Sequence, residues 1–256
     1  MANELLSPFA EMLPRLYELK NATDQSHPDA YFHKDFESRF AEGRTVLEQR
    51  QRIERVLAAL DRDAWSDLKA RAAAVAHKKD GGRGWRELFD TFDEAKGYVH
   101  LQSNGCTSIA FIKRQPRRKS PDLRALQGSK HVLCEVKTIN VSQDEAERRA
   151  QIAQGKTMAG DVSNSVKVEM LRKVSATLGH AVTQLDGEDP SRAARRLVFT
   201  VLHFDDWVGD YQTEYIAQLD AHLLANPVAG AELVFCPASH LFERRFTMRS
   251  ATVVEL

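Results

Sequence analysis

The sequence predicts a mixed α/β (α+β) protein, in which helices flank a mixed β-sheet and an N-terminal helical region precedes it. Three observations lead to this fold class. Apolar, β-prone runs at 131–139, 196–204 and 231–237 alternate with segments of helical periodicity. Two shorter β-prone runs, 106–113 and 122–126, directly precede the first of them. Strands in direct succession pair as an antiparallel meander, whereas strands separated by helices favour parallel pairing.

The first 80 residues predict helices almost throughout. The stretch 40–75 is rich in Ala, Leu, Glu and Arg, which are good helix formers. Apolar residues recur there at helical spacing, at Val46, Ile53, Val56, Leu57 and Leu60. Three glycines within 78–84 then mark a break. We therefore divide the chain into a helical region, 1–80, and an α/β core, 81–256.

The core predicts the following elements in order. An amphipathic helix over 85–101 ends at Ser103-Asn104-Gly105. A turn at 128–129 joins the strands 122–126 and 131–139, and the polar segment 143–163 is expected to be partly loop. The remaining elements are a helix over 166–185, a buried strand over 196–204, a helix over 211–225, a buried strand over 231–237 and an edge strand within 246–256.

Composition excludes several classes of protein. Lys+Arg and Asp+Glu number 36 each, so the net charge is zero, which excludes a uniformly basic nucleic-acid-binding chain but leaves room for a local basic patch. The mean hydropathy is −0.44. No apolar run approaches the roughly 18 residues of a membrane span, so no membrane partner is expected.

The cysteines and the start of the chain indicate a cytoplasmic protein. Three cysteines, Cys106, Cys134 and Cys236, are an odd number, and two lie in strand-like runs, as expected for buried free thiols in a reducing compartment. No closely spaced Cys or His pair predicts zinc. The first twenty residues carry acids where a secretion signal would be basic.

The segment 121–137 carries the most specific chemistry. Side chains alternate along a strand, so Glu135 and Lys137 project on one side. If the Asp122 segment pairs antiparallel through the turn at 128–129, the carboxylates of Asp122 and Glu135 converge. Two close carboxylates repel, and a divalent cation such as Mg²⁺, which prefers oxygen ligands, removes that conflict. A plain ion pair between Glu135 and Lys137, with Asp122 capping a turn, is the alternative.

These residues resemble the motif of the PD-(D/E)XK nuclease superfamily. Pro121-Asp122 matches its PD element, and Glu135-Val136-Lys137 matches its (D/E)XK element. The order helix, three strands, helix, strand over 85–205 is similar to the restriction-endonuclease-like core of that superfamily. The triplets at 18–20, 67–69 and 94–96 also read acid-x-Lys, but they lie in helix-like segments.

The resemblance implies a role for each matching residue. Asp122 and Glu135 would bind Mg²⁺, the backbone carbonyl of Val136 would be a further ligand, and Lys137 would act on the attacking water. Mn²⁺ is expected to substitute for Mg²⁺. Many members add a glutamate from the preceding helix, for which Glu94 is our candidate, with Glu87 and Asp90 as alternatives.

Two further features predict contacts with a nucleic acid. A basic loop precedes Asp122, and its cations are Lys113, Arg114, Arg117, Arg118 and Lys119. A solvated charge run is the alternative interpretation of this loop. On the helix 166–185, Lys173 is the candidate for the site, with Gln184 behind it, although plain solvent exposure is the commoner outcome for His180 and Gln184.

The sequence thus predicts a Mg²⁺-dependent nuclease that hydrolyses DNA phosphodiester bonds, of the restriction-endonuclease type. Cutting both strands usually takes two active sites, so a homodimer is expected. A catalytically inactive nuclease fold that binds nucleic acid or protein is the alternative, and a helical interaction protein with an α/β scaffold is a third. The resemblance leaves open whether RNA is also a substrate.

Overall fold

The computed structural model describes residues 7–33, 36–38, 40, 44–80, 84–113, 120–153, 164–203, 211–238 and 248–254. Its contacts divide the chain into two compact units, Met1–Val99 and His100–Leu256. Helix α6 (Arg86–Ser103) runs from the first unit into the second. No helix in the described ranges combines the length and the apolar character that a membrane crossing requires.

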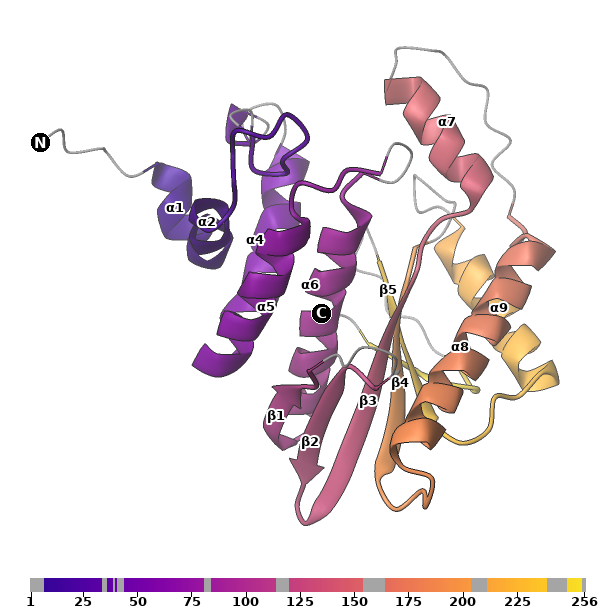
Figure 1. Cartoon of the computed structure of the whole chain (residues 1–256). Helices are drawn as coiled ribbons and strands as arrows, with labels where there is room; N and C mark the ends of the chain where they lie inside the picture. Colours follow the sequence, from indigo (N-terminus) through magenta and orange to yellow (C-terminus); the bar gives the residue numbers. More distant parts are fainter. Residues whose placement is uncertain are drawn as a thin grey trace, which may run out of the picture. The chain divides into compact units, whose positions relative to one another are not determined.

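Unit 1 is helical, as the sequence predicts for the N-terminal region. Besides α6, its helices are α1 (Pro8–Met12), α2 (Pro14–Asn21), α4 (Arg44–Ala58) and α5 (Arg62–Val75) (Figure 1). Asp61 caps α5 by accepting the N–H of Ala64 at 2.8 Å. Val56 and Leu57 of α4 are buried, and so is Leu60 just past its end, in agreement with the apolar spacing in the sequence.

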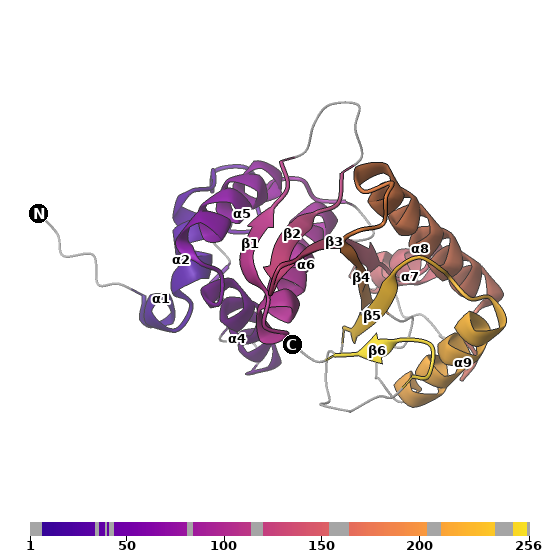
Figure 2. The same ribbon diagram turned by 90° about the horizontal axis from the view of Figure 1, so that it is seen from below.

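Unit 2 holds a six-stranded mixed sheet, which confirms the coarse fold class. The strands are β1 (Thr107–Phe111), β2 (Leu123–Gln127), β3 (Lys130–Ile139), β4 (Arg195–Leu202), β5 (Glu232–Pro237) and β6 (Thr252–Val253). They lie side by side in sequence order (Figure 2). The meander β1–β2–β3 is antiparallel, and the pairs β3–β4 and β4–β5 are parallel, as predicted. The edge pair β5–β6, whose direction was not predicted, is also parallel.

Glycine makes the tight turn of this meander. Gly128 has a φ of 60°, a backbone conformation that costs glycine little, and it joins β2 to β3 at the predicted turn. The resulting two-residue connection fixes the register, in which Gln127 lies opposite Lys130 and Leu123 opposite Cys134. The turn thereby determines which β2 residue stands beside each β3 residue.

Two long helices cover one face of the sheet. Helices α8 (Val168–Glu188) and α9 (Gln212–Ala225) lie along that face (Figures 1 and 2). Their apolar sides form one buried cluster with residues of β3, β4 and β5, among them Ile139, Val198 and Phe235. At roughly 2 kcal/mol for each large apolar side chain, this burial holds α8 firmly against β3.

The segment after β3, predicted to be partly loop, contains a helix that the sequence pattern did not specify. Residues Gln143–Ala153 form helix α7, while 154–163 lie outside the described residues. Ser142 begins the helix by accepting the N–H of Glu145 at 3.2 Å. The segment is rich in Glu, Arg, Gln and Ala, so helix propensity forms the helix without an apolar stripe.

Candidate metal and phosphate site

The register of β2 and β3 brings the two predicted carboxylates to one face of the sheet. Leu123 pairs with Cys134, so the next position outward sets Asp122 opposite Glu135. Residues directly opposite each other in an antiparallel pair project on the same face. Asp122 and Glu135 therefore share the face that α8 covers further along the sheet, as the alternation in the sequence predicts.

A hydrogen bond fixes Asp122 at this position. Its Oδ2 accepts the backbone N–H of Val136 at 2.9 Å. The N–H and C=O of one residue point to the same edge of a strand, so the carbonyl of Val136 also points toward the edge where Asp122 lies. On this side of β3 the backbone thus supplies an oxygen beside the two carboxylates.

Lys137 stands beside Glu135 on the same face and binds two partners. Its Nζ forms an ion pair with Oε1 of Glu135 and donates a hydrogen bond to Oε1 of Gln184 at 2.8 Å. Glu135 is 1% exposed, so its carboxylate depends on such partners for stability. The lysine therefore neutralises a buried charge and is itself held between β3 and α8.

The negative charges of the two carboxylates affect the pKa of a neighbouring thiol, Cys134. The pKa of Cys134 is raised well above its usual value, mainly because the thiol is fully buried. The charges of Asp122 and Glu135 raise that pKa further. Both carboxylates thus lie within electrostatic reach of one position in β3.

The oxygen donors of this site suit a hard divalent cation. Two carboxylates and a backbone carbonyl are the ligands that Mg²⁺ accepts, with water filling the remaining positions. In the described ranges, no group of three or more His, Cys, Asp or Glu side chains is arranged to hold a metal ion. Metal binding here would therefore rest on Asp122, Glu135 and the Val136 carbonyl, a set that fits Mg²⁺ chemically.

The α8 residue that meets the site is Gln184. Solvent exposure was the expected outcome for Gln184, and this prediction is wrong, because the half-buried side chain accepts a hydrogen bond from Lys137. Lys173, the candidate from the sequence, is exposed and donates to the carbonyl of Asn140 at 3.0 Å, just past the end of β3. His180 is exposed, as predicted.

Of the cations predicted in the basic loop, Lys113 lies within the described residues. Lys113 is exposed, and the residue before it, Ile112, donates its N–H to the backbone carbonyl of Asp122 at 2.9 Å. Lys113 thus follows directly on the chain segment that pairs with Asp122. The predicted cations Arg114, Arg117, Arg118 and Lys119 lie outside the described residues.

The candidate helix acid, Glu94, belongs to unit 1. It is 6% exposed and forms an ion pair with Arg71 of α5. Glu87, one of the two alternatives, is exposed and pairs with Lys78 at 3.2 Å. A role of Glu94 at a metal ion stays a prediction.

One further polar residue, which was not predicted from the sequence, lies beside Lys137. Thr200 of β4 pairs with Lys137 in the parallel register, so both side chains share the α8 face. Thr200 is fully buried, and its hydroxyl has no hydrogen-bond partner in the part of the chain that the structure describes. The sequence does contain a sign of this residue's importance, because Thr200 interrupts an otherwise continuous apolar run from Leu197 to Leu202.

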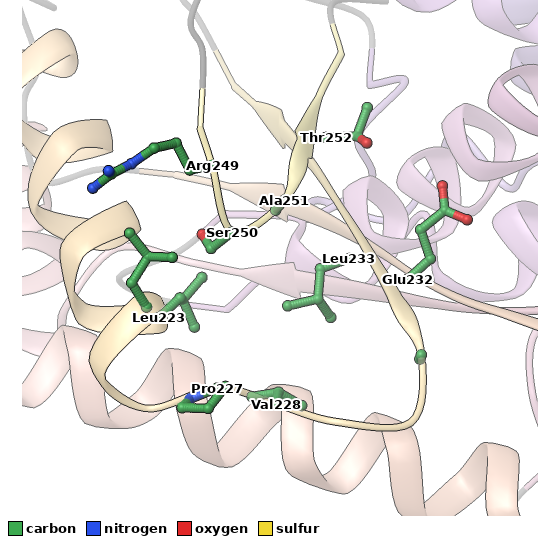
Figure 3. Close-up of a pocket in the computed structure, with 11 residues that line it drawn as sticks. Leu223, Pro227, Val228, Glu232, Leu233, Arg249, Ser250, Ala251 and Thr252 are labelled. Carbon is green, nitrogen blue, oxygen red and sulfur yellow. The ribbon is translucent and has the colours of Figure 1, made fainter.

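A separate pocket of about 470 Å³ lies between α9, β5 and the segment 249–252 (Figure 3). Its lining mixes apolar residues, among them Leu223, Pro227 and Leu233, with polar ones such as Ser250 and Arg249, the latter at one side. Neither carboxylate of the candidate site nor Lys137 lines this pocket.

Comparison of the chain with models of known protein families, with curated proteins and with solved structures gave no match. The fold and the site define the chain as a mixed α/β protein with two carboxylates and a lysine gathered on one face of its sheet. Its function has to be argued from the chemistry of that site.

Proposed function

We propose that the protein is a Mg²⁺-dependent nuclease of the PD-(D/E)XK type, which hydrolyses phosphodiester bonds of DNA. The observation that carries the proposal is the meeting of Asp122, Glu135 and Lys137 on one face of β2 and β3. The order α6, β1, β2, β3, α8, β4 agrees with the restriction-endonuclease-like core, although α7 is inserted before α8. This agreement supports the assignment of the finer fold.

Each residue has a chemical task in this proposal. Asp122, Glu135 and the Val136 carbonyl hold the cation, which supplies positive charge beside the scissile phosphate. Lys137 donates hydrogen bonds that orient the attacking water, and its charge favours the anionic transition state. Gln184 keeps the Lys137 ammonium group in place through its 2.8 Å hydrogen bond.

The proposal includes a substrate, an assembly and a location. Lys113, and the further cations of the loop that follows it, hold the DNA backbone near Asp122. Restriction-type cleavage of both strands takes two copies of the site, so the active form is a homodimer. The three cysteines are free and buried, which suits the reducing cytoplasm.

Cleavage of supercoiled and linear DNA tests the proposal. The purified protein is incubated with Mg²⁺, with Mn²⁺ or with EDTA, and a parallel series uses RNA. We expect cutting in either metal and none in EDTA. Lys137→Ala and Asp122→Asn should abolish it, and Asp122→Asn keeps an oxygen that can accept the Val136 N–H.

Lys130→Ala is the matched control. Lys130 is an exposed lysine of the same hairpin, but it lies at the turn and projects on the opposite face from Lys137. This variant should cut DNA like the unsubstituted protein. The proposal fails if neither nucleic acid is cut and calorimetry detects no Mn²⁺ binding that depends on Asp122.

One observation favours a second candidate function. Lys137 already neutralises Glu135 through an ion pair, so the face is stable without a cation. A chain that kept this pair for stability alone would be an inactive nuclease fold that binds nucleic acid or protein. Binding of DNA without cleavage, together with no Mn²⁺ binding, would support this second function.

A further inference from the structure

Arg124 lies on the same face of β2 as Asp122, two residues further along the strand. It pairs with Leu133 of β3 and with Ala110 of β1, and neither neighbour carries a charge. The rise of a strand places residues two apart at about 7 Å. The backbone of Arg124 therefore lies one strand repeat away from that of Asp122, on the same face.

Arg124 lies at the border of the sheet face that helices α8 and α9 cover. Leu133 still packs against the apolar cluster beneath α8 and α9, whereas Arg124, one strand further out, is exposed. An arginine at the border of a sheet face that helices cover presents its hydrogen-bond donors to solvent beside those helices. Such a position suits the binding of a large anionic ligand that lies along the sheet.

Within the described residues, Arg124 has no counter-charge. No carboxylate of the described residues forms an ion pair with it. Asp122, the acid nearest in sequence on this face, instead accepts the Val136 N–H. The planar fork of donors on Arg124 is thus available to an anion, and phosphate oxygens match that geometry.

We propose that Arg124 binds a phosphate of the DNA strand, next to the phosphate that is cleaved between Asp122 and Lys137. This inference rests on the proposed function and adds a substrate-binding residue that the sequence motif does not contain. The spacing of about 7 Å along β2 is comparable with the separation of neighbouring phosphates on one DNA strand.

The salt dependence of DNA binding tests this inference without any cleavage. The full-length protein is titrated against a fluorescently labelled DNA duplex over a series of KCl concentrations, in EDTA and again in Ca²⁺. Loss of one phosphate contact lowers the slope of log affinity against log salt by about 0.9. We expect Arg124→Ala to show this shallower slope and several-fold weaker binding, and Arg124→Lys to keep the slope.

Lys130→Ala is again the matched control, because it removes an exposed cation from the same hairpin on the opposite face. It should leave both the affinity and the slope unchanged. If the unsubstituted protein binds DNA and Arg124→Ala binds it with the same slope, the inference is wrong and the proposed function stands. An equal loss in Lys130→Ala also overturns it. If the unsubstituted protein binds no DNA in either solution, the proposed function fails as well.

Discussion

The carboxylate of Asp122 accepts the backbone N–H of Val136 at 2.9 Å. The regular pairing of β2 with β3 begins one residue later in the chain, at Leu123. The side chain of Asp122 thus extends the ladder by one hydrogen bond beyond the first residue of β2. A residue that the proposed chemistry needs is in this way also part of the sheet.

Two substitutions of Asp122 separate these two roles. Asp122→Asn keeps an oxygen that accepts the Val136 N–H, whereas Asp122→Ala leaves that donor without its partner. We expect Asp122→Ala to be less stable than Asp122→Asn by about 1–2 kcal/mol in urea unfolding. Both variants should lose Mn²⁺ affinity in calorimetry, because both lose the charge. Equal stabilities of the two variants would show that the hydrogen bond contributes nothing.

The pair of Glu135 and Lys137 is expected to be strongly coupled in stability. Lys137→Met removes the ion-pair partner of a carboxylate that is 1% exposed, and we expect a loss of about 3 kcal/mol. Adding Glu135→Gln removes the buried charge, so the double variant should be more stable than the sum of the single losses predicts. Urea unfolding of the four proteins measures this coupling, and additive losses would contradict it.

The sequence predicts most of unit 2 because its signals are local. The apolar runs of β3, β4 and β5, the turn at Gly128 and the alternation of Glu135 with Lys137 each follow from neighbouring residues. Helix α7 was not predicted because its polar segment lacks an apolar stripe; helix propensity and the Ser142 cap support it instead.

The contacts between distant segments could not be predicted in this way. Gln184 rather than Lys173 meets Lys137, because the choice depends on how α8 is rotated and shifted along β3. Periodicity identifies the apolar stripe of a helix but not its axial position against a strand. The ion pair of Glu94 with Arg71 likewise joins residues from two helices of unit 1.

Glu54 is expected to make the stability of unit 1 depend on pH. This carboxylate of α4 is 5% exposed and accepts the N–H groups of Arg15 and Leu16, at 2.8 and 3.0 Å. It thereby caps the beginning of α2, where no side chain of α2's own N-cap residue does so. We expect Glu54→Ala to lower the free energy of unfolding by about 1–2 kcal/mol.

The size of that loss should change with pH. Burial raises the pKa of Glu54 above its usual value of 4.5, although the two backbone hydrogen bonds oppose the shift. A raised pKa in the folded state means that this carboxyl stabilises folding most when protonated, and that this contribution falls as the pH rises through the raised pKa. The deficit of Glu54→Ala should therefore be largest in acid and smaller at neutral pH. Urea unfolding across that range measures it, and a deficit that grows toward neutral pH would contradict the shift.

Arg71 and Glu94 allow the structural and catalytic roles of the helix acid to be distinguished. Their side chains form an ion pair in which the Glu94 carboxylate is buried and the Arg71 side chain is 29% exposed, so either single substitution should lower stability by about 1–3 kcal/mol. The resemblance gives Glu94 a second task at the metal, which Arg71 does not share. We therefore expect Glu94→Gln to lower both stability and Mg²⁺-dependent DNA cleavage, and Arg71→Met to lower stability alone. Cleavage is compared well below the unfolding temperature of either variant, with circular dichroism as the check on folding. If both variants cut DNA like the unsubstituted protein, Glu94 serves only the ion pair, and Asp122 and Glu135 are the carboxylates on which the proposed chemistry depends.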